Sequence, residues 1–76
     1  MEGILTNEEI ASALEAIIVD GAFNGYALLV AISHQAIDQW DRDTIRKFQL
    51  EREKCTYRDN AQLEIIADKI RTHKWD

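Results

Sequence analysis

The chain has 76 residues, of which 46% are hydrophobic and 30% charged, and its formal net charge at pH 7 is −5. This length supports a single small core, which excludes a large or multidomain architecture. There is no proline, and there are only three glycines and one cysteine, so a sheet-rich fold is disfavoured and an internal disulfide is excluded. We predict a single compact all-α domain over residues 1–76, with four or five helices.

The acidic residues are distributed unevenly. Residues 1–40 carry six acids and no lysine or arginine, whereas residues 41–76 carry eight acids and nine bases. Because lysine and arginine neutralise phosphates, an acidic chain starts at a disadvantage in binding DNA. The field at the contact face counts for more than the total charge, so DNA binding is not excluded.

Several features predict a cytoplasmic protein without membrane contact. The longest apolar run, residues 26–32, is too short to cross a bilayer. The N-terminal run MEGILTNEE has no basic residue before its apolar residues, unlike a signal peptide. The lone Cys55 fits a reducing compartment.

The first predicted helix covers Thr6–Asp20. Thr6 and Glu9 have the spacing of a capping box, in which each side chain accepts a hydrogen bond from a backbone N–H of the other residue. Gly21 can adopt the left-handed conformation that ends a helix. One apolar stripe follows the helical period and predicts a face packed on the core: Ile10, Ala13, Leu14, Ile17 and Ile18.

The centre of the chain, residues 23–40, is typical of a helix-turn-helix, with helices over Asn24–Val30 and Ser33–Trp40. Ser33 is placed to cap the second helix. Small or apolar residues are expected to fill the crossing between the two helices: Tyr26, Ala27, Val30, Ile32, Ile37 and Trp40. The outward face of the second helix would enter a major groove, where Gln and His can bind base edges. The predicted base contacts are Ser33, His34, Gln35 and Gln39.

Two further helices are predicted, over Asp43–Lys54 and Asp59–His73, with a break near Cys55–Asp59. Asp41 or Asp43 can cap the first of them, and Thr56 or Asp59 the second. Arg42, Arg46 and Lys47 form a basic cluster that is expected to contact the DNA backbone. Leu63, Ile66, Ala67 and Ile70 give the last helix a narrow apolar stripe, and Trp75 follows it, so residues 59–75 form a candidate oligomerisation helix.

The run AISHQAIDQWDR, residues 31–42, resembles the small phage helix-turn-helix transcription regulators of the lambda Cro and CII class. The similarity continues into WDRDTIRKF, residues 40–48, and weakly back to Ser12–Leu14. It implies a phage or prophage transcription regulator that binds duplex DNA as a dimer or higher oligomer. Two such copies would place their second helices one DNA turn apart.

Two alternatives remain open. Residues 25–40 could form one continuous buried helix instead of a helix-turn-helix. The protein could also be an acidic interaction module that binds a host or phage regulatory protein, such as a phage-encoded inhibitor or a repressor antagonist. The second alternative is favoured by the lack of bases in residues 1–40 and by five side chains: Asp38, Asp41, Asp43, Leu28 and Leu29.

Catalysis has little support in the sequence. His34 and His73 have no cysteine or acid at a recognised metal-ligand spacing, and no base can be assigned to Cys55. There is no glycine-rich phosphate loop and no nucleophile motif. We therefore expect no catalytic residue, no metal site and no cofactor, and hence a protein that is not an enzyme.

Overall fold

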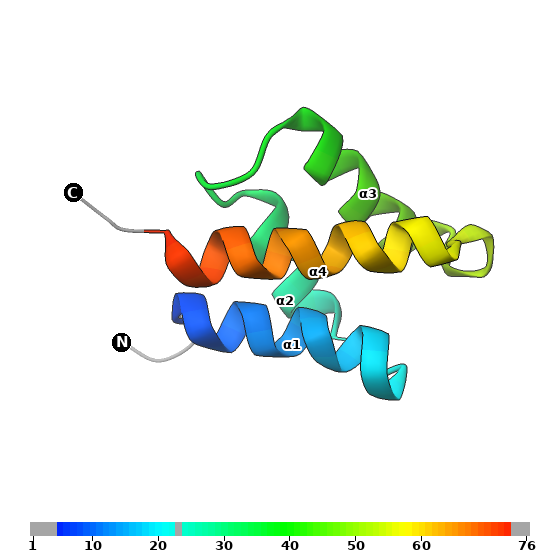
Figure 1. Ribbon diagram of the computed structural model, residues 1–76, viewed down its shortest axis with the longest axis horizontal. Helices are drawn as coiled ribbons and strands as arrows, with labels where there is room; N and C mark the ends of the chain where they lie inside the picture. Colours follow the sequence, from blue (N-terminus) through cyan, green and yellow to red (C-terminus); the bar gives the residue numbers. More distant parts are fainter. Residues whose placement is uncertain (1–4, 23, 74–76) are drawn as a thin grey trace.

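The computed structural model describes residues 5–22 and 24–73, and these ranges contain helices and no strand. The described residues form four α-helices, labelled in Figure 1, and one short 3-10 helix: α1 (Asn7–Asp20), α2 (Gly25–Ile32), α3 (Gln39–Leu50), η1 (Arg52–Lys54) and α4 (Tyr57–Thr72). The prediction of an all-α domain is confirmed. None of the helices is long and apolar enough to traverse a bilayer, as far as the described residues go. Trp75 lies outside the described residues.

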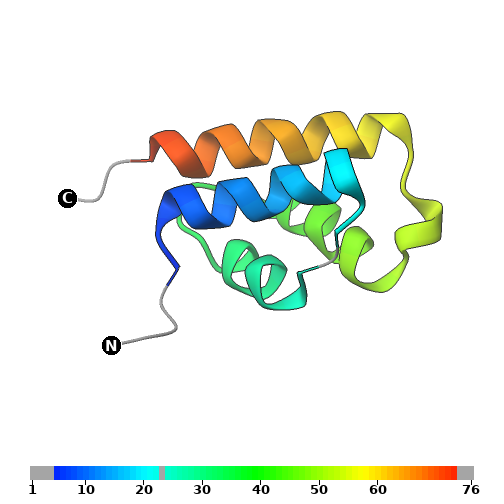
Figure 2. The ribbon, with the colours of Figure 1, turned by 90° about the horizontal axis from the view of Figure 1, so that it is seen from below.

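The helices form two layers. α1 and α4 lie side by side and antiparallel in one layer, with α2 and α3 together in the second layer, as the two ribbon views show (Figures 1 and 2). The antiparallel arrangement brings Asn7 at the start of α1 to within hydrogen-bonding distance of His73 at the end of α4. α4 packs against α1 on one side and against α3 on the other.

The core lies between the two layers. The stripe predicted on the last helix is buried throughout, and in α1 Ile10, Leu14 and Ile17 are buried, with Ile18 partly buried. A helix that buries one such stripe gains most of its stability from packing rather than from its own hydrogen bonds. The core consists of Ile10, Ala11, Leu14, Ile17, Leu28, Ala31, Ile37, Ile45, Phe48, Leu63, Ile66, Ala67 and Ile70.

The helix ends follow local rules where the sequence predicts them clearly. Thr6 and Glu9 form the capping box of α1, and Gly21 ends that helix with φ of 69°. Thr56 and Asp59 form a second capping box at the start of α4, which confirms the predicted break near Cys55–Asp59. Both starts agree with the sequence because a capping box involves only four consecutive residues.

The prediction of a helix over Ser33–Trp40 is wrong. Residues 33–38 connect α2 to α3, and Ser33 ends α2 rather than capping a following helix. Asp38 instead caps α3, through a capping box with Asp41. His34 and Ile37 of this connection are both buried. The continuous helix over residues 25–40 is excluded, because residues 33–38 are not helical.

α3 begins and ends four residues before its predicted bounds, which changes which of its residues reach the core. α3 begins at Gln39 and ends at Leu50, so the predicted span Asp43–Lys54 is wrong at both ends. In this phase Asp41, Thr44, Ile45 and Phe48 face inward, and Trp40 is 68% exposed rather than packed in a crossing. In α2, Ala27 is buried as predicted, but Tyr26 is exposed.

Candidate functional site

The residues predicted to contact DNA bases do not share a helix face. Ser33 and Gln35 are exposed in the connection between α2 and α3, while Gln39 lies in the first turn of α3 and donates its amide hydrogen to Asp43 Oδ1 at 2.9 Å. His34 is buried, so its assignment as a base contact is wrong. The predicted reading surface is thus divided between a connection and a separate helix.

His34 holds the connection against the ends of α1 and α4. The backbone N–H of Ala36 donates to His34 Nδ1 at 3.1 Å, which places the ring proton on Nε2, 2.9 Å from Asn7 Oδ1. The Asn7 side chain in turn donates to the His73 carbonyl at 3.2 Å. Burial, and to a lesser extent the neighbouring His73, lowers the pKa of His34. The neutral His34 ring forms hydrogen bonds at both nitrogens, so its role is structural.

The three predicted contacts to the DNA backbone already have partners within the domain. Arg42 Nε donates to the Ile32 carbonyl at 3.0 Å, near the end of α2. Arg46 lies 3.6 Å from the Asp43 carboxylate, and Lys47 Nζ lies 3.0 Å from Asp59. Arg46, with 53% of its side chain exposed, is the most accessible of the three bases.

A buried carboxylate joins α3 to α4. Asp41 is fully buried and accepts hydrogen bonds at 2.7 Å from both Gln62 Nε2 and Lys69 Nζ. The bond to Asp41 raises the pKa of Lys69. The sequence interpretation gave Asp41 as a possible helix cap and as one of the acids that favour a protein partner, and it did not predict that this side chain is buried. Its spacing of three from Asp38 was the available signal, since that spacing is typical of a capping box.

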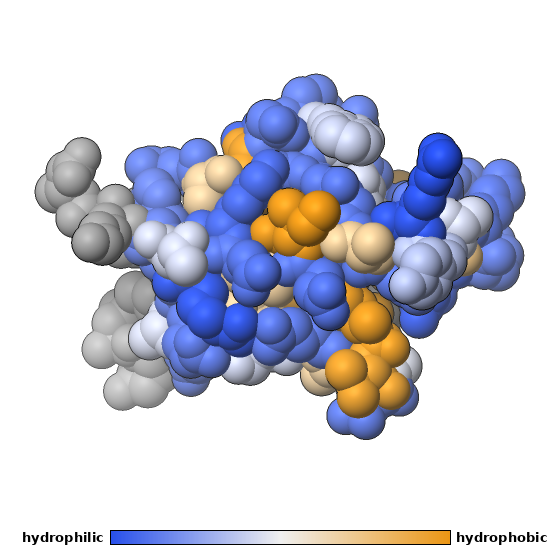
Figure 3. Space-filling model, in the orientation of Figure 1, coloured by the Kyte–Doolittle hydropathy of each residue, from blue (hydrophilic) through white to orange (hydrophobic). Residues whose placement is uncertain are grey.

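A groove of about 490 Å³ runs between α3 and α4. Trp40 borders it on the α3 side, and Ile65, which is 49% exposed, borders it on the α4 side. Figure 3 shows an apolar patch over the middle of α4, bordered by hydrophilic residues, and another apolar patch near the end of α1. The sequence interpretation missed this groove because it placed Trp40 inside the core. The groove is lined by Trp40, Thr44, Arg58, Asp59, Ala61, Gln62 and Ile65.

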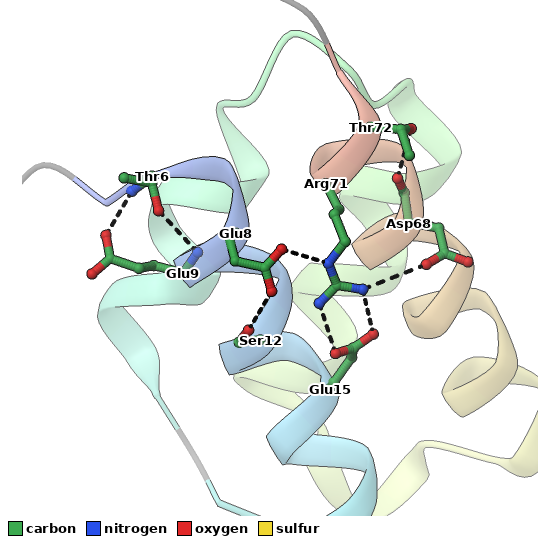
Figure 4. A network of polar contacts seen from close by, with 8 residues as sticks. All are labelled: Thr6, Glu8, Glu9, Ser12, Glu15, Asp68, Arg71 and Thr72. Carbon is green, nitrogen blue, oxygen red and sulfur yellow. Dashed lines mark hydrogen bonds and ion pairs between the residues drawn. The ribbon is translucent and has the colours of Figure 1, made fainter.

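An ion-pair network lies across α1 and α4 on the molecular surface (Figure 4). Arg71 donates two hydrogen bonds to the Glu15 carboxylate, at 2.8 and 2.9 Å, and a third to Glu8 at 2.9 Å. These bonds to Arg71 lower the pKa values of both glutamates and raise that of Arg71. Arg71 therefore keeps the carboxylates of Glu8 and Glu15 ionised, and the network links α1 to α4.

Charge is segregated along the described chain. Residues 39–58 hold six bases and four acids, whereas residues 5–22 and 24–38 hold five acids and no base. Residues 59–73 add three acids and two bases. Positive charge is therefore concentrated on α3, η1 and the start of α4.

The described residues contain no group of three or more His, Cys, Asp or Glu side chains that could bind a metal ion. The Cys55 thiol is partly buried and lies 3.8 Å from the Glu51 carbonyl, to which it donates. Burial, reinforced by Asp59, raises the pKa of this thiol. A raised pKa keeps the thiol protonated at neutral pH and so lowers its reactivity.

Comparison of the chain with protein-family models, with curated proteins and with solved structures gives no match. The candidate site is therefore described by its own geometry, and it is centred on the groove between α3 and α4.

Proposed function

We propose that this domain is an acidic protein-interaction module that binds its partner through the groove between α3 and α4. The observation that carries this proposal is the exposure of two large hydrophobic side chains on opposite walls of the groove. Trp40 of α3 is 68% exposed, and Ile65 of α4 is 49% exposed. An exposed aromatic residue beside a partly apolar groove is a typical anchor of a protein–protein interface.

The alternative of reading DNA through residues 33–47 has weaker support. Of the bases in that range, Arg42 and Lys47 bind groups of the domain itself at 3.0 Å, and only Arg46 is widely exposed. If Arg42 or Lys47 bound a phosphate, it would first lose its contact within the domain, and this loss would reduce the free energy gained from binding DNA. Asp43, also exposed on α3, would repel phosphates.

A second candidate function, a DNA-binding phage-type transcription regulator, is favoured by the segregation of charge. Arg46, Arg52, Lys54 and Arg58 are all exposed on α3, η1 and the start of α4. In that case α3 would replace the predicted helix over Ser33–Trp40 as the element entering the major groove. The four exposed bases would then hold the phosphates beside it.

Fluorescence anisotropy of labelled duplex DNA separates the two candidates. We expect no binding by tens of micromolar protein at about 50 mM salt, where phosphate contacts are strongest. Binding that weakens steeply at about 200 mM salt, and that is lost in Arg46→Ala/Arg52→Ala but kept in the matched Glu9→Ala variant, would overturn the proposal. Circular dichroism of each variant would establish that it is folded.

A photo-crosslinking residue in place of Trp40 provides the positive test in cells of the source organism. We expect a crosslinked protein that is absent when the same residue replaces Ser12, which is exposed on α1. The crosslink should disappear in Ile65→Glu, and the isolated partner should bind the purified domain. Equal crosslinking from positions 12 and 40 would contradict a specific groove.

A further inference from the structure

The outward face of α4 carries a regular stripe. Five residues follow one another at alternating spacings of three and four, and every one is exposed: Arg58, Ala61, Ile65, Asp68 and Thr72. This is the spacing of the contact positions in a coiled coil. The opposite face of α4 is already buried in the core, so the stripe is a second contact face on the same helix.

The stripe is complementary to itself when it is read in the reverse direction. Arg58 and Asp68 each lie five residues from position 63, and Ala61 and Ile65 each lie two residues from it. Two antiparallel copies centred on position 63 would therefore place Arg58 opposite Asp68 twice. They would also place the small Ala61 opposite the larger Ile65 twice, which gives each isoleucine room to pack.

We propose that the α4 stripe, defined as these five residues, binds the same stripe of a second copy of this chain, antiparallel and centred on position 63. Four of its residues, Arg58, Ala61, Ile65 and Asp68, meet the same four residues of the second copy, and Thr72 lies beyond them. The inference rests on the proposed function, because it names a second copy as the occupant of the groove. The interface is isologous, so each favourable contact occurs twice. The second copy's α4 lies along the groove wall formed by Ile65 and covers the rim near Trp40.

The charges of the stripe are available for this contact. Arg58 makes no ion pair with another described residue. Asp68 has 71% of its side chain exposed and lies 3.7 Å from Arg71, whose stronger bonds go to Glu15. Both groups can pair across the interface without breaking a short contact within the domain.

Glu64 is expected to destabilise the dimer in this register and in no other. It lies on the flank of the stripe away from Gln62, and two-fold symmetry about position 63 brings it close to the second copy's Glu64. Repulsion between like charges keeps the dimer weak, so Glu64→Gln should tighten it severalfold. Another register would separate the two glutamates and remove this effect.

Sedimentation equilibrium over about 1 µM to 1 mM protein tests the association. We expect a monomer–dimer equilibrium that Ile65→Glu abolishes, since a charge would be buried at the centre of the contact. Val19→Glu is the matched control, because Val19 is 80% exposed near the end of α1, outside the stripe. It should leave the dimer dissociation constant unchanged.

Charge reversal then tests the register. Arg58→Asp and Asp68→Arg should each weaken the dimer about tenfold, because two attractive pairs become repulsive. The double variant should recover most of the loss. In a Cys55→Ser background, oxidation of a mixture of Ala61→Cys and Ile65→Cys chains should give mainly the mixed disulfide dimer.

Three outcomes would overturn the inference: a monomer at every concentration, a dimer that Ile65→Glu does not affect, or charge reversals that do not compensate each other. None of these outcomes touches the proposed function, which also allows a different protein in the groove. DNA binding by the four exposed bases would overturn the proposed function, and sedimentation would still decide whether the α4 stripe pairs.

Discussion

α4 is held by polar contacts on both sides, but in two different environments. On the α3 side, the fully buried Asp41 binds Lys69 and Gln62 at 2.7 Å. On the α1 side, Arg71 binds Glu8 and Glu15 at similar distances, but all three side chains are substantially exposed to solvent. The two contacts therefore differ in the access of their carboxylates to water, which is 0% for Asp41 but 65% for Glu8 and 37% for Glu15. The two cations are similarly exposed, Lys69 at 39% and Arg71 at 30%.

This difference decides which contact the fold depends on. A buried carboxylate that loses its partner keeps its desolvation cost, so breaking one such pair destabilises strongly. An exposed ion pair that is broken is replaced by hydration, and its net contribution is small. The α3 side of α4 should therefore be sensitive to substitution and the α1 side tolerant.

The largest effect is expected for Lys69→Met, which leaves Asp41 buried without its cation. We expect a loss of about 3 kcal/mol in the free energy of unfolding, measured by urea denaturation. Asp41→Asn/Lys69→Met should be more stable than Lys69→Met alone, because no charge then remains buried. If Lys69→Met were as stable as the wild type, solvent would have to reach the Asp41 carboxylate.

An intermediate effect is expected for His34→Ala, at the end of the molecule where the α2–α3 connection meets α1. The substitution leaves Asn7 Oδ1 and the Ala36 N–H without their bonds to the ring, which should cost about 1–2 kcal/mol of unfolding free energy. Ser33→Ala is the matched control, because Ser33 is exposed in the same connection.

The lowered pKa of His34 should also make the free energy of unfolding depend on pH. Its pKa is lowered from the ordinary 6.5, so below that pH the unfolded chain takes up a proton that the folded protein resists. Stability should therefore fall as the pH drops through about 6.5, until the lower folded pKa is reached. Urea denaturation between pH 7.5 and 5.5 should show this step in wild type and not in His34→Ala.

The smallest effect is expected for Arg71→Met on the α1 side. The urea midpoint should move less than in His34→Ala, and about 1 M NaCl should reduce the difference further. The lowered pKa values of Glu8 and Glu15 mean that their contribution is present above the ordinary value of 4.5 and is lost as the pH falls through the lower folded values. A loss as large as that of Lys69→Met would contradict the comparison.

The fold was predictable where short-range patterns agree with one another. α1 begins and ends within one residue of its predicted span, and α4 within two. Each has a capping box at its start and an apolar stripe along its length, so local and long-range preferences favour the same boundaries. The break before α4 was predictable on the same basis.

The site was less predictable because it depends on where α3 begins. The sequence interpretation placed one helix over Ser33–Trp40 and a second over Asp43–Lys54, whereas the structure has a single helix, α3, capped by Asp38. The predicted boundaries placed Trp40 in a helix crossing and did not place Asp41 in the core. The start of α3 therefore decides whether Trp40 is packed in a crossing or borders a groove.

The sequence by itself determined the helical class, the capping box of α1, the break before α4, and the apolar stripes of α1 and α4 that face the core. Each of these depends on residues within a few positions of one another. Only the tertiary structure decided that His34 is buried against Asn7, that Asp41 is joined to Lys69, and that Trp40 borders a groove with Ile65. These pairs are 25 to 28 residues apart in the chain, and only packing of the whole domain fixes whether a side chain meets water, an ion or an apolar neighbour.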